Sequence, residues 1–472
     1  MKLRERQFRF LDRKESLQLI KTSMFSLTIA DAHRLLREKQ ISPTELVSLY
    51  LEQIEQAEPT IRAWVTIEKD RAIERAKELE HKVNQFKTFS QLYGIPYAAK
   101  DIIYTKGINT EGGSKALKGF TPDQDATVVQ KLSDAGAILL GKTTTTEFAN
   151  WGGPPETRNP WNLNHTPGGS SSGSAAAMAA GMTLMALGTQ TAGSLSRPAA
   201  YNGLTVLKAT YGRISKAGVI PASWSLDHIG AFTKTVEDTV LVYNEISGPD
   251  QHDSSTWTLP KQDLCLREKK DYKIGIVIDE YFKDTDGELQ KSIEDAIQVL
   301  QNIGFKTISI HLPGSLEAAN AAQHIVMKSE TAHYHADKYL KEPALFGPYL
   351  QQFIKEGLQI KANDYLKAQR IRSIFREQMT ELFKDVDLLI TPASPTPAPK
   401  GISETGSPAY NLPFTNAGVP TLTIPIGYTQ INHLPMAMQL VAGPMHEQKL
   451  IDAGFLFQKE TDWHMKTPEM LR

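Results

Sequence analysis

Residues 168–199 read GGSSSGSAAAMAAGMTLMALGTQTAGSLSRPA, a stretch that holds six serines and no histidine. Glycine and serine at this density are typical either of a flexible linker or of a segment whose backbone comes close to a reacting group. Alanine-rich SGSAAAMAAG (172–181) predicts a tightly packed helix, and MTLMALGT (182–189) predicts the strand that follows. We therefore favour the second interpretation, in which a helix and a strand hold the serines in place.

The same alternation of strand and helix continues on both sides of this stretch. Upstream, LYGIPYAAKDII (92–103) predicts a short buried strand. The alternation predicts an α/β fold, a mostly parallel β-sheet of many strands with helices on both faces. Residues 312–385 are mainly helical, and we expect a cap over the sheet there. Further strands are predicted near residues 137–141, 273–278, 306–312, 387–392, 421–427 and 435–443.

The N-terminal part divides into an extension and the start of the domain. Residues 42–45, Ser-Pro-Thr-Glu, predict a helix start, because serine caps the N-terminus, proline suits the first turn and glutamate completes a capping box. We treat residues 1–27 as an N-terminal extension and residues 28–472 as one domain.

The composition limits the classes of partner. The net charge of −1 gives no electrostatic footprint for nucleic acid or an anionic membrane. No run of about 18 apolar residues predicts a membrane span, and the charged N-terminus is unlike a signal peptide. A single cysteine, Cys265, indicates a reducing compartment. We expect a cytoplasmic enzyme with a small-molecule substrate and no cofactor, and we leave open whether it forms a homodimer.

Two segments match known motifs by their letters, but their sequence context argues against a phosphate-binding loop and against a metal site. Gly136–Thr143 fits the phosphate-loop pattern, but a predicted helix precedes it and its interior is an apolar strand. Glu330, His333 and His335 are close enough in sequence to suggest metal ligands. His335 leaves the helical face that the other two share, so we expect solvated histidines on a helix and no metal site.

A third match offers a different nucleophile. Gly169–Gly173 fits G-x-S-x-G, which would make Ser171 the attacking residue, with His228 or His433 as its base. A loop precedes this motif, whereas the nucleophile of such hydrolases follows a strand. We keep Ser171 as an alternative.

Several motifs, in order, resemble the amidase signature family. They are GGSSSGSAAAMAAG, GTQTAGS, RPAA and LKATYGRIS, with GIPYAAKDIIYTKGINTEGGS upstream and SLDHIGAFTKTVED and NAGVPTLTIPIG downstream. The resemblance runs from about residue 28 to the C-terminus. It implies a single α/β domain with a mixed sheet, and amide hydrolysis by a Ser–cis-Ser–Lys triad through an acyl-enzyme.

Carried onto this sequence, the resemblance implies Lys100 as the base, Ser170 as the bridging serine after a cis peptide, and Ser194 as the nucleophile. The amides of Thr191, Ala192, Gly193 and Ser194 would surround the oxyanion. The residues support these roles, because a serine needs a base beside it and lysine is the available one here. The apolar neighbours of Lys100 predict burial, which disfavours the ammonium form and lowers its pKa.

This chain departs from the commonest family pattern, GTDTGGSIR-x-P, at three places. Gln190 replaces the aspartate, Ala192 replaces a glycine, and Ser196 stands two residues after the nucleophile, with Arg197 one place later. Ala192 keeps its amide but must avoid positive φ. Gln190 removes a charge that could pair with the arginine. The triad residues are untouched, so we expect activity.

The substrate is not specified by these motifs. Trp151, Trp224 and Tyr104 are candidates for the substrate pocket and suggest a hydrophobic acyl group. A second hypothesis is the glutaminase subunit of a tRNA-dependent amidotransferase, which shares the motifs. In those glutaminases an acidic residue holds the glutamine amine, whereas Pro408 occupies the position that we align with it. A third hypothesis, a non-catalytic relative, requires the loss of triad residues that this chain keeps.

Overall fold

The computed structural model describes the chain except for residues 1–19, 22–23, 83–89, 151–152, 257–260 and 470–472. Within the described residues, eleven strands form one sheet in the order β1-β3-β2-β4-β6-β5-β10-β11-β9-β7-β8. The strands are β1 Trp64–Ile67, β2 Pro96–Lys100, β3 Ile138–Thr143, β4 Met185–Gln190, β5 Thr205–Lys208, β6 His228–Thr233, β7 Lys273–Val277, β8 Lys306–Ile310, β9 Leu388–Pro392, β10 Thr421–Tyr428 and β11 Pro435–Ala442.

The sheet is mixed, and the expectation that it is mostly parallel is wrong. Strand β2 runs parallel to β3 and β4, and β7 runs parallel to β8 and β9. The other adjacent pairs are antiparallel. The short turn between β10 and β11 closes a hairpin, and β5 is joined to β6 by a connection without a crossover helix. Antiparallel pairs need no such helix, so they escape a prediction based on strand–helix alternation.

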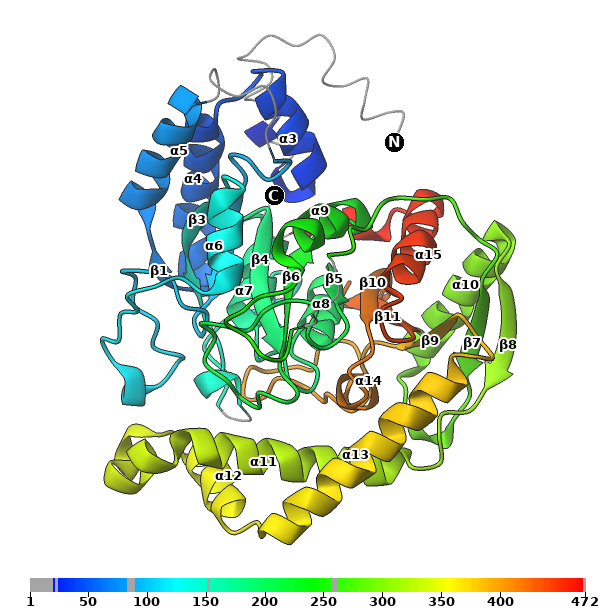
Figure 1. Cartoon of the computed structure of the whole chain (residues 1–472). Coiled ribbons are helices and arrows are strands. Elements are labelled where there is room, and N and C mark those ends of the chain that lie inside the picture. The colour runs from blue at the N-terminus through cyan, green and yellow to red at the C-terminus, as the bar shows by residue number, and fades with distance from the viewer. Residues whose placement is uncertain (1–19, 22–23, 83–89, 151–152, 257–260, 470–472) are drawn as a thin grey trace.

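Helices cover both faces of the sheet, which confirms the α/β class (Figure 1). On one face α9, α10 and α15 pack against the central strands, and on the other face α7 and α8 do. The helices are α3 Ile29–Arg37, α4 Pro43–Ile61, α5 Lys69–Lys82, α6 Thr127–Asp134, α7 Ser172–Ala179, α8 Ser196–Asn202, α9 Val236–Ile246, α10 Gly287–Ile303, α11 Leu316–Lys341, α12 Pro348–Leu358, α13 Ala362–Leu382, α14 Leu412–Asn416 and α15 Glu447–Glu460.

Helix α7 brings the serine-rich stretch against the sheet. All its residues are buried, and they are serine, glycine, alanine and one methionine. These short side chains let the helix lie close to strands β2, β3 and β4. The segment just before α7, which carries Ser170, is therefore held next to the ends of those strands.

Three long helices occupy most of residues 312–385. Helix α11 packs along both α12 and α13 and also contacts α14. Figure 1 shows the three helices lying across one end of the sheet, below α8 and α14 in that view. Asn416 of α14 donates its side-chain amide to the carbonyl of Ala319 in α11 at 2.6 Å, so these helices are joined to the body of the fold close to the serine-rich stretch.

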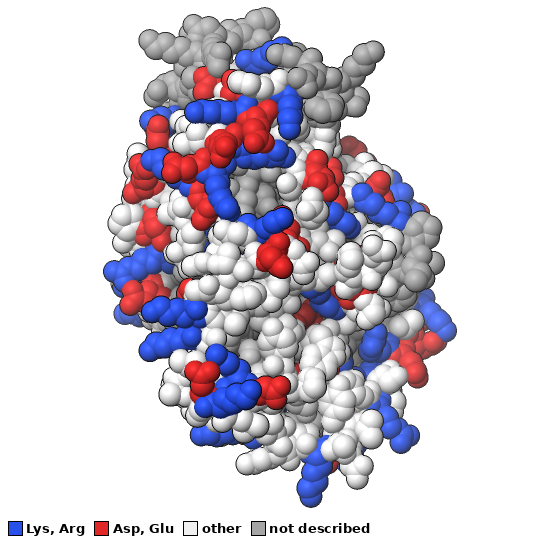
Figure 2. Space-filling view, turned by 60° about the vertical axis from the view of Figure 1, so that its left-hand side comes forward, with Lys and Arg blue, Asp and Glu red and all other residues white. Residues whose placement is uncertain are grey.

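The surface carries charges of both signs. Figure 2 shows Lys and Arg side chains interspersed with Asp and Glu over much of one face, in keeping with the net charge of −1. None of the described helices is long and apolar enough to cross a membrane.

The start of α4 provides a test of the local fold. Ser42 accepts a hydrogen bond from the amide of Glu45 (3.2 Å), and the Glu45 carboxylate accepts one from the amide of Ser42 (2.8 Å), which confirms the predicted capping box. We expect Ser42→Ala to destabilise the protein by about 1 kcal/mol, because one helix-end amide loses its acceptor. Thermal unfolding would show this as a lowered midpoint.

The matched control is Ser48→Ala in the same helix. The Ser48 hydroxyl donates only to the carbonyl of Thr44, one turn earlier. Alanine is the better helix former at such a position, so the midpoint should hold or rise. Equal losses in both variants would contradict the capping role of Ser42.

Candidate active site

The candidate site lies at the carboxyl ends of two neighbouring parallel strands. Lys100 is the last residue of β2, and Gln190 is the last residue of β4. The register pairs Ala99 with Leu187, so Lys100 lies beside the residues that end β4. Ligand sites of sheets with parallel strands commonly form at such carboxyl ends.

Lys100 is fully buried and is surrounded by hydroxyl groups. Its Nζ donates to the Oγ of Ser170 at 2.7 Å, to the Oγ1 of Thr189 at 2.9 Å and to the Oγ of Ser171 at 3.1 Å. Burial holds the pKa of Lys100 well below its ordinary value, and the more distant Asp227 carboxylate opposes this shift only partly. The lysine predicted as a base thus sits where its neutral form is favoured.

The three hydroxyl groups around Lys100 determine which of them can donate a hydrogen bond to the neutral amine. A neutral amine keeps two N–H donors and gains a lone pair, so one of the three hydroxyls must donate to Lys100. Ser171 donates its proton to the carbonyl of Thr189 at 3.2 Å. Ser170 and Thr189 remain as donors to the amine, and of these two Ser170 makes the shorter contact with Lys100.

Ser170 and Ser194 line the same cavity. Both are buried, with 3% and 7% of their surface exposed, and the peptide bond between Gly169 and Ser170 is cis, as the resemblance implies. The cavity has a volume of about 640 Å³. Its wall is formed by Thr146, Ala149, Asn150, Ser170, Thr191, Ala192, Ser194, Arg197, His324, Met327, Tyr349, Ser403–Ala409 and Leu412.

Three other serines of the stretch, Ser171, Ser172 and Ser174, make structural hydrogen bonds. Ser171 bridges Lys100 and the backbone of Thr189, and in the described part of the chain its hydrogen-bond partners do not include His228 or His433. His228 instead donates its Nδ1 proton to the carbonyl of Leu226. The hydroxyls of Ser172 and Ser174 donate to backbone carbonyls at 2.8 and 2.9 Å.

The segment from Thr191 to Ser194 has its carbonyls tied away from the cavity. The carbonyl of Thr191 accepts from the Gln323 side chain of α11 at 2.9 Å, and that of Ala192 accepts from the Thr415 hydroxyl of α14 at 2.8 Å. The carbonyl of Gly193 accepts from the amide of Arg197 at 2.9 Å. Three separate helices thus fix the orientation of these peptide planes.

The amides of the same four residues have no such partners. Within the part of the chain that the structure describes, none of the amides from Thr191 to Ser194 donates to an acceptor. Buried backbone amides are almost always paired, so four consecutive exceptions beside a cavity form a natural place for a negatively charged oxygen. Ala192 does not adopt positive φ, so its methyl group brings no backbone strain to this segment.

Gln190 supports the backbone around Ser194 through hydrogen bonds that need no charged side chain. Its Oε1 accepts from the amides of Leu195 and Ser196 at 2.8 and 2.9 Å, and its Nε2 donates to the hydroxyl of Thr415 at 2.9 Å. It therefore caps the start of α8 and ties it to α14. An amide oxygen is sufficient for this, so the loss of the family's aspartate leaves the backbone around Ser194 supported.

Sequence reasoning missed two contributors to the site. Thr189 accepts a hydrogen bond from Lys100, and Asp227 accepts one from the Thr191 hydroxyl at 2.5 Å. Burial raises the pKa of Asp227 to about 6, although the amides of Ala222 and Ser223 also donate to it. Both residues lie inside motifs quoted for the resemblance, but only the fold shows what they touch.

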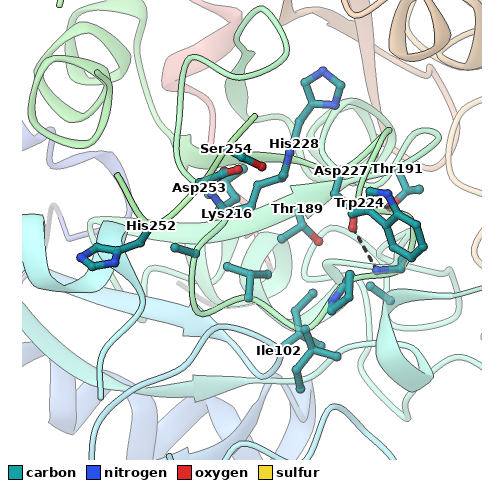
Figure 3. A pocket seen from close by; sticks show the side chains of 17 residues that line it. Ile102, Thr189, Thr191, Lys216, Trp224, Asp227, His228, His252, Asp253 and Ser254 are labelled. Atoms are coloured by element: carbon teal, nitrogen blue, oxygen red, sulfur yellow. Dashed lines mark hydrogen bonds between the residues drawn. The ribbon is translucent and has the colours of Figure 1, made fainter. Parts of the chain in front are cut away.

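Figure 3 shows the side chains that line a second cavity, of about 250 Å³. Thr191 and Ala149 line both cavities, and Trp224 lines the second one only. Tyr104 lines neither and packs on Phe120 at 5.4 Å between ring centroids. The third candidate for the substrate pocket, Trp151, lies outside the described residues.

The discounted motifs have other roles in the structure. Gly136–Thr143 follows helix α6 and leads into strand β3, which is the arrangement expected of a chance match. Glu330 accepts from the Ser223 hydroxyl, and the described residues contain no cluster placed to hold a metal ion. The expectation of solvated histidines is wrong for His335, which is buried with its ring 4.5 Å from that of Phe148, because Phe148 and Phe346 cover it.

Comparison with known proteins agrees with this geometry. A family model described as Amidase matches residues 45–451. The A-type subunit of the glutamyl-tRNA(Gln) amidotransferase of Synechococcus sp. (strain JA-3-3Ab) is 34% identical over 476 residues, or 93% of either chain. The native peptide amidase from Stenotrophomonas maltophilia has a TM-score of 0.83 at 28% identity, and the corresponding amidotransferase subunit from Thermotoga maritima has one of 0.79 at 27% identity; each comparison covers 94% of this chain and 98% of the other.

Fold, site and similarities together define a hydrolase that acts on amide carbon–nitrogen bonds. The chain belongs to the amidase family, whose model spans most of its length.

The buried lysine predicts how activity depends on pH. Because burial lowers the pKa of Lys100, its neutral form dominates above that lowered value and not only above the ordinary 10.5. We expect kcat/KM to rise with pH through one ionisation and to reach its plateau well below pH 10.5. Initial rates from pH 5 to 10 measure this. An acid limb near 6.5 that survives in Lys100→Met would point to a histidine and contradict the assignment.

Thr189 should tune that ionisation. Thr189→Val removes an acceptor of the lysine N–H while keeping the β-branched shape, and losing a hydrogen bond to the charged form lowers a pKa. We expect the acid limb to move down by about one pH unit. Thr183→Val is the control, since among the described residues that hydroxyl bonds only to the carbonyls of Pro96 and Met185. An unmoved limb in Thr189→Val would show that this contact does not affect the base.

Proposed function

We propose that this protein is an amidohydrolase in which Ser194 attacks a carboxamide, Ser170 relays the proton and Lys100 is the base. The observation that carries the proposal is the hydrogen bond of 2.7 Å between Lys100 and Ser170 beneath a cavity that Ser194 also lines. The unpaired amides of residues 191–194 belong to a segment of which Thr191, Ala192 and Ser194 line the same cavity. Nucleophile, relay, base and oxyanion donors then meet around one bound carbonyl group.

The first half of the reaction forms an acyl-enzyme. The Ser194 oxygen bonds to the carbonyl carbon while its proton passes to Ser170, whose own proton passes to Lys100. A hydroxyl can relay in this way because it both donates and accepts. The carbonyl oxygen becomes negative and is held by the amides of residues 191–194, where each donor is worth about 2.7–4 kcal/mol. The proton then returns through Ser170 to the nitrogen, the carbon–nitrogen bond breaks, and ammonia or an amine leaves.

The second half releases the acid. A water molecule attacks the ester carbon, gives its proton to Lys100 through Ser170, and forms a second tetrahedral oxyanion. When that intermediate collapses, Ser194 regains a proton from the same relay and the carboxylic acid departs. Lys100 begins and ends each half-reaction neutral, which suits the burial that lowers its pKa.

We expect a partly apolar acyl group, because apolar and aromatic side chains line the cavity beside polar and charged ones that include Arg197 and Glu404. Met327 and Tyr349 reach it from α11 and α12, and Pro408 and Leu412 form part of the opposite wall. In this proposal residues 312–385 act as the cap that sets specificity, because they supply one side of the cavity over a rigid sheet. We infer a cytoplasmic location from the single cysteine, Cys265, which is exposed and forms no disulfide.

A second candidate function is supported by the sequence relatives. Glutamyl-tRNA(Gln) amidotransferase subunits match nearly the whole chain at 34% identity, which favours a glutaminase that hands ammonia to a partner. Against it, Pro408 is buried in the cavity wall at the position that we align with the acidic residue of those glutaminases. Proline offers no charge to a glutamine amine, and although Glu404 lines the same cavity four residues earlier, we place the independent amidase first because the aligned position itself is not acidic.

Ser194→Ala tests the central assignment. We expect turnover to fall by about 10⁴-fold or more, because the atom that forms the acyl bond is gone. Labelling by a fluorophosphonate probe should disappear as well. Ser171→Ala is the matched control from the same stretch and should keep its labelling. Labelling that persists in Ser194→Ala and is lost in Ser171→Ala would overturn the assignment.

A panel of amides separates the two candidate functions. The purified chain, assayed with aliphatic, aryl and peptide amides and with glutamine, should release ammonia from uncharged carboxamides without any partner protein. Glutamine hydrolysis alone, and only in the presence of two smaller co-purifying proteins, would favour the glutaminase.

A further inference from the structure

Arg197 is a buried arginine next to the nucleophile that the proposed reaction does not use. It is the second residue of α8, and only 5% of its surface is exposed. One guanidinium nitrogen, Nη2, donates to the carbonyl of Gly169 at 2.6 Å and to the hydroxyl of Thr405 at 3.1 Å. The other, Nη1, donates to the carbonyl of Gly406 at 2.6 Å. All three acceptors are uncharged.

These contacts join three segments around the cavity. Gly169 immediately precedes Ser170, and Thr405 and Gly406 belong to the cavity wall. The backbone amide of Arg197 also holds the carbonyl of Gly193, immediately before Ser194. One residue therefore connects both serine-bearing loops to the wall that faces a bound substrate.

The cavity wall at residues 405–408 packs directly against the loops that carry Ser170 and Ser194. A small displacement of one of these segments therefore displaces the others. A Cβ atom added at Gly169 would lie 2.6 Å from the Cγ2 of Thr405, and one added at Gly193 would lie 3.0 Å from the Cβ of Pro408. Such close approach explains why glycine precedes each serine. Closely packed atoms transmit a displacement to their neighbours. The hydrogen bonds of Arg197 add a second, directional connection between the same segments.

The position of the arginine in the sequence makes this arrangement possible. Successive residues of an α-helix differ by about 100° around its axis, so Arg197 points in a different direction from Ser196, where the family pattern has its arginine. Gln190 binds the amides of Leu195 and Ser196. The guanidinium of Arg197 is thereby left to reach the wall segment and Gly169.

We propose that Arg197 is a positioning residue that fixes Ser170 in its relay position and couples this position to the cavity wall at Thr405 and Gly406. The inference rests on the proposed function, because it gives Ser170 the relay role. A planar guanidinium directs its N–H groups to several acceptors at fixed angles, whereas a lysine ammonium acts as a single point charge. Burial lowers the pKa of Arg197 to about 10, so the group stays charged at neutral pH.

Arg197→Ala tests the proposal through kcat and chemical rescue. We expect kcat to fall by about 100-fold, the loss that follows displacement of a reacting group by about 1 Å, while KM changes less than about threefold. Guanidinium chloride at non-denaturing concentration should raise the kcat of Arg197→Ala by about tenfold or more, because it occupies the vacated site. Arg197→Lys should remain impaired, since it cannot hold both carbonyls.

Arg213→Ala is the matched control for removal of a buried guanidinium. Arg213 is 2% exposed, and its Nε donates to the hydroxyl of Tyr243, outside both cavities. This variant should lower the thermal midpoint without any rescue of kcat by guanidinium. If Arg197→Ala behaves in the same way, or keeps its kcat, the positioning role is wrong. If Arg197→Ala does not fold, a wild-type kcat in folded Arg197→Lys overturns the proposal.

Fluorophosphonate labelling separates this test from that of the proposed function. The wild-type chain should be labelled at Ser194, and Arg197→Ala should be labelled more slowly by the same factor as its kcat. A wild-type chain that is not labelled would refute the proposed function itself. Labelling of Arg197→Ala at the wild-type rate would refute only the role of Arg197.

Discussion

A lysine buried among neutral hydroxyls is the constraint on which the rest of the site depends. Removing an ammonium group from water is costly, and the partners within hydrogen-bonding distance of Lys100 are three hydroxyl oxygens that cannot neutralise it. The neutral amine is therefore favoured. The lysine lies at the end of a strand beside a closely packed helix of small residues, and hydroxyl groups surround its amine.

The helices that cross the end of the sheet support the segment from Thr191 to Ser194 as well as the cavity wall. Gln323 of α11 and Thr415 of α14 hold the carbonyls of Thr191 and Ala192. Met327 of the same α11 faces the cavity. Met327, which lines the cavity, is thus one helical turn from Gln323, which holds a carbonyl of the segment proposed to donate to an oxyanion. A substitution in α11 can therefore affect both the cavity and that segment.

The departures from the family pattern form a consistent set. Gln190 keeps the capping hydrogen bonds with an uncharged oxygen, and Ser196 leaves little bulk at the position after Leu195. The two terminal nitrogens of Arg197 donate to carbonyls and a hydroxyl in place of a carboxylate, while its buried Nε has no hydrogen-bond partner among the described residues. The chain exchanges a buried charge for neutral hydrogen-bond acceptors while the backbone around Ser194 stays supported.

The sequence alone determined the local elements and the family. The capping box at Ser42, the alanine-rich helix after Ser171 and the presence of two strands follow from patterns within a few residues. The predicted strand bounds, 92–103 and 182–189, differ from the observed Pro96–Lys100 and Met185–Gln190. The roles proposed for Lys100, Ser170 and Ser194 come from motif resemblance, because nothing local indicates that residues 70 positions apart form a hydrogen bond. Strand direction in the sheet was misjudged for the same reason, since pairing is a contact between distant segments.

Only the tertiary structure decided which groups surround these residues. Thr189, Asp227 and Arg197 are ordinary residues in the sequence, and their partners lie 89, 36 and 28 positions away. The peptide planes of Thr191 and Ala192 are oriented by hydrogen bonds from helices more than a hundred residues further along the chain. Propensity and periodicity act over one or two turns of chain, whereas burial, the pKa of a lysine and the orientation of a peptide plane are set by whatever the fold packs against them.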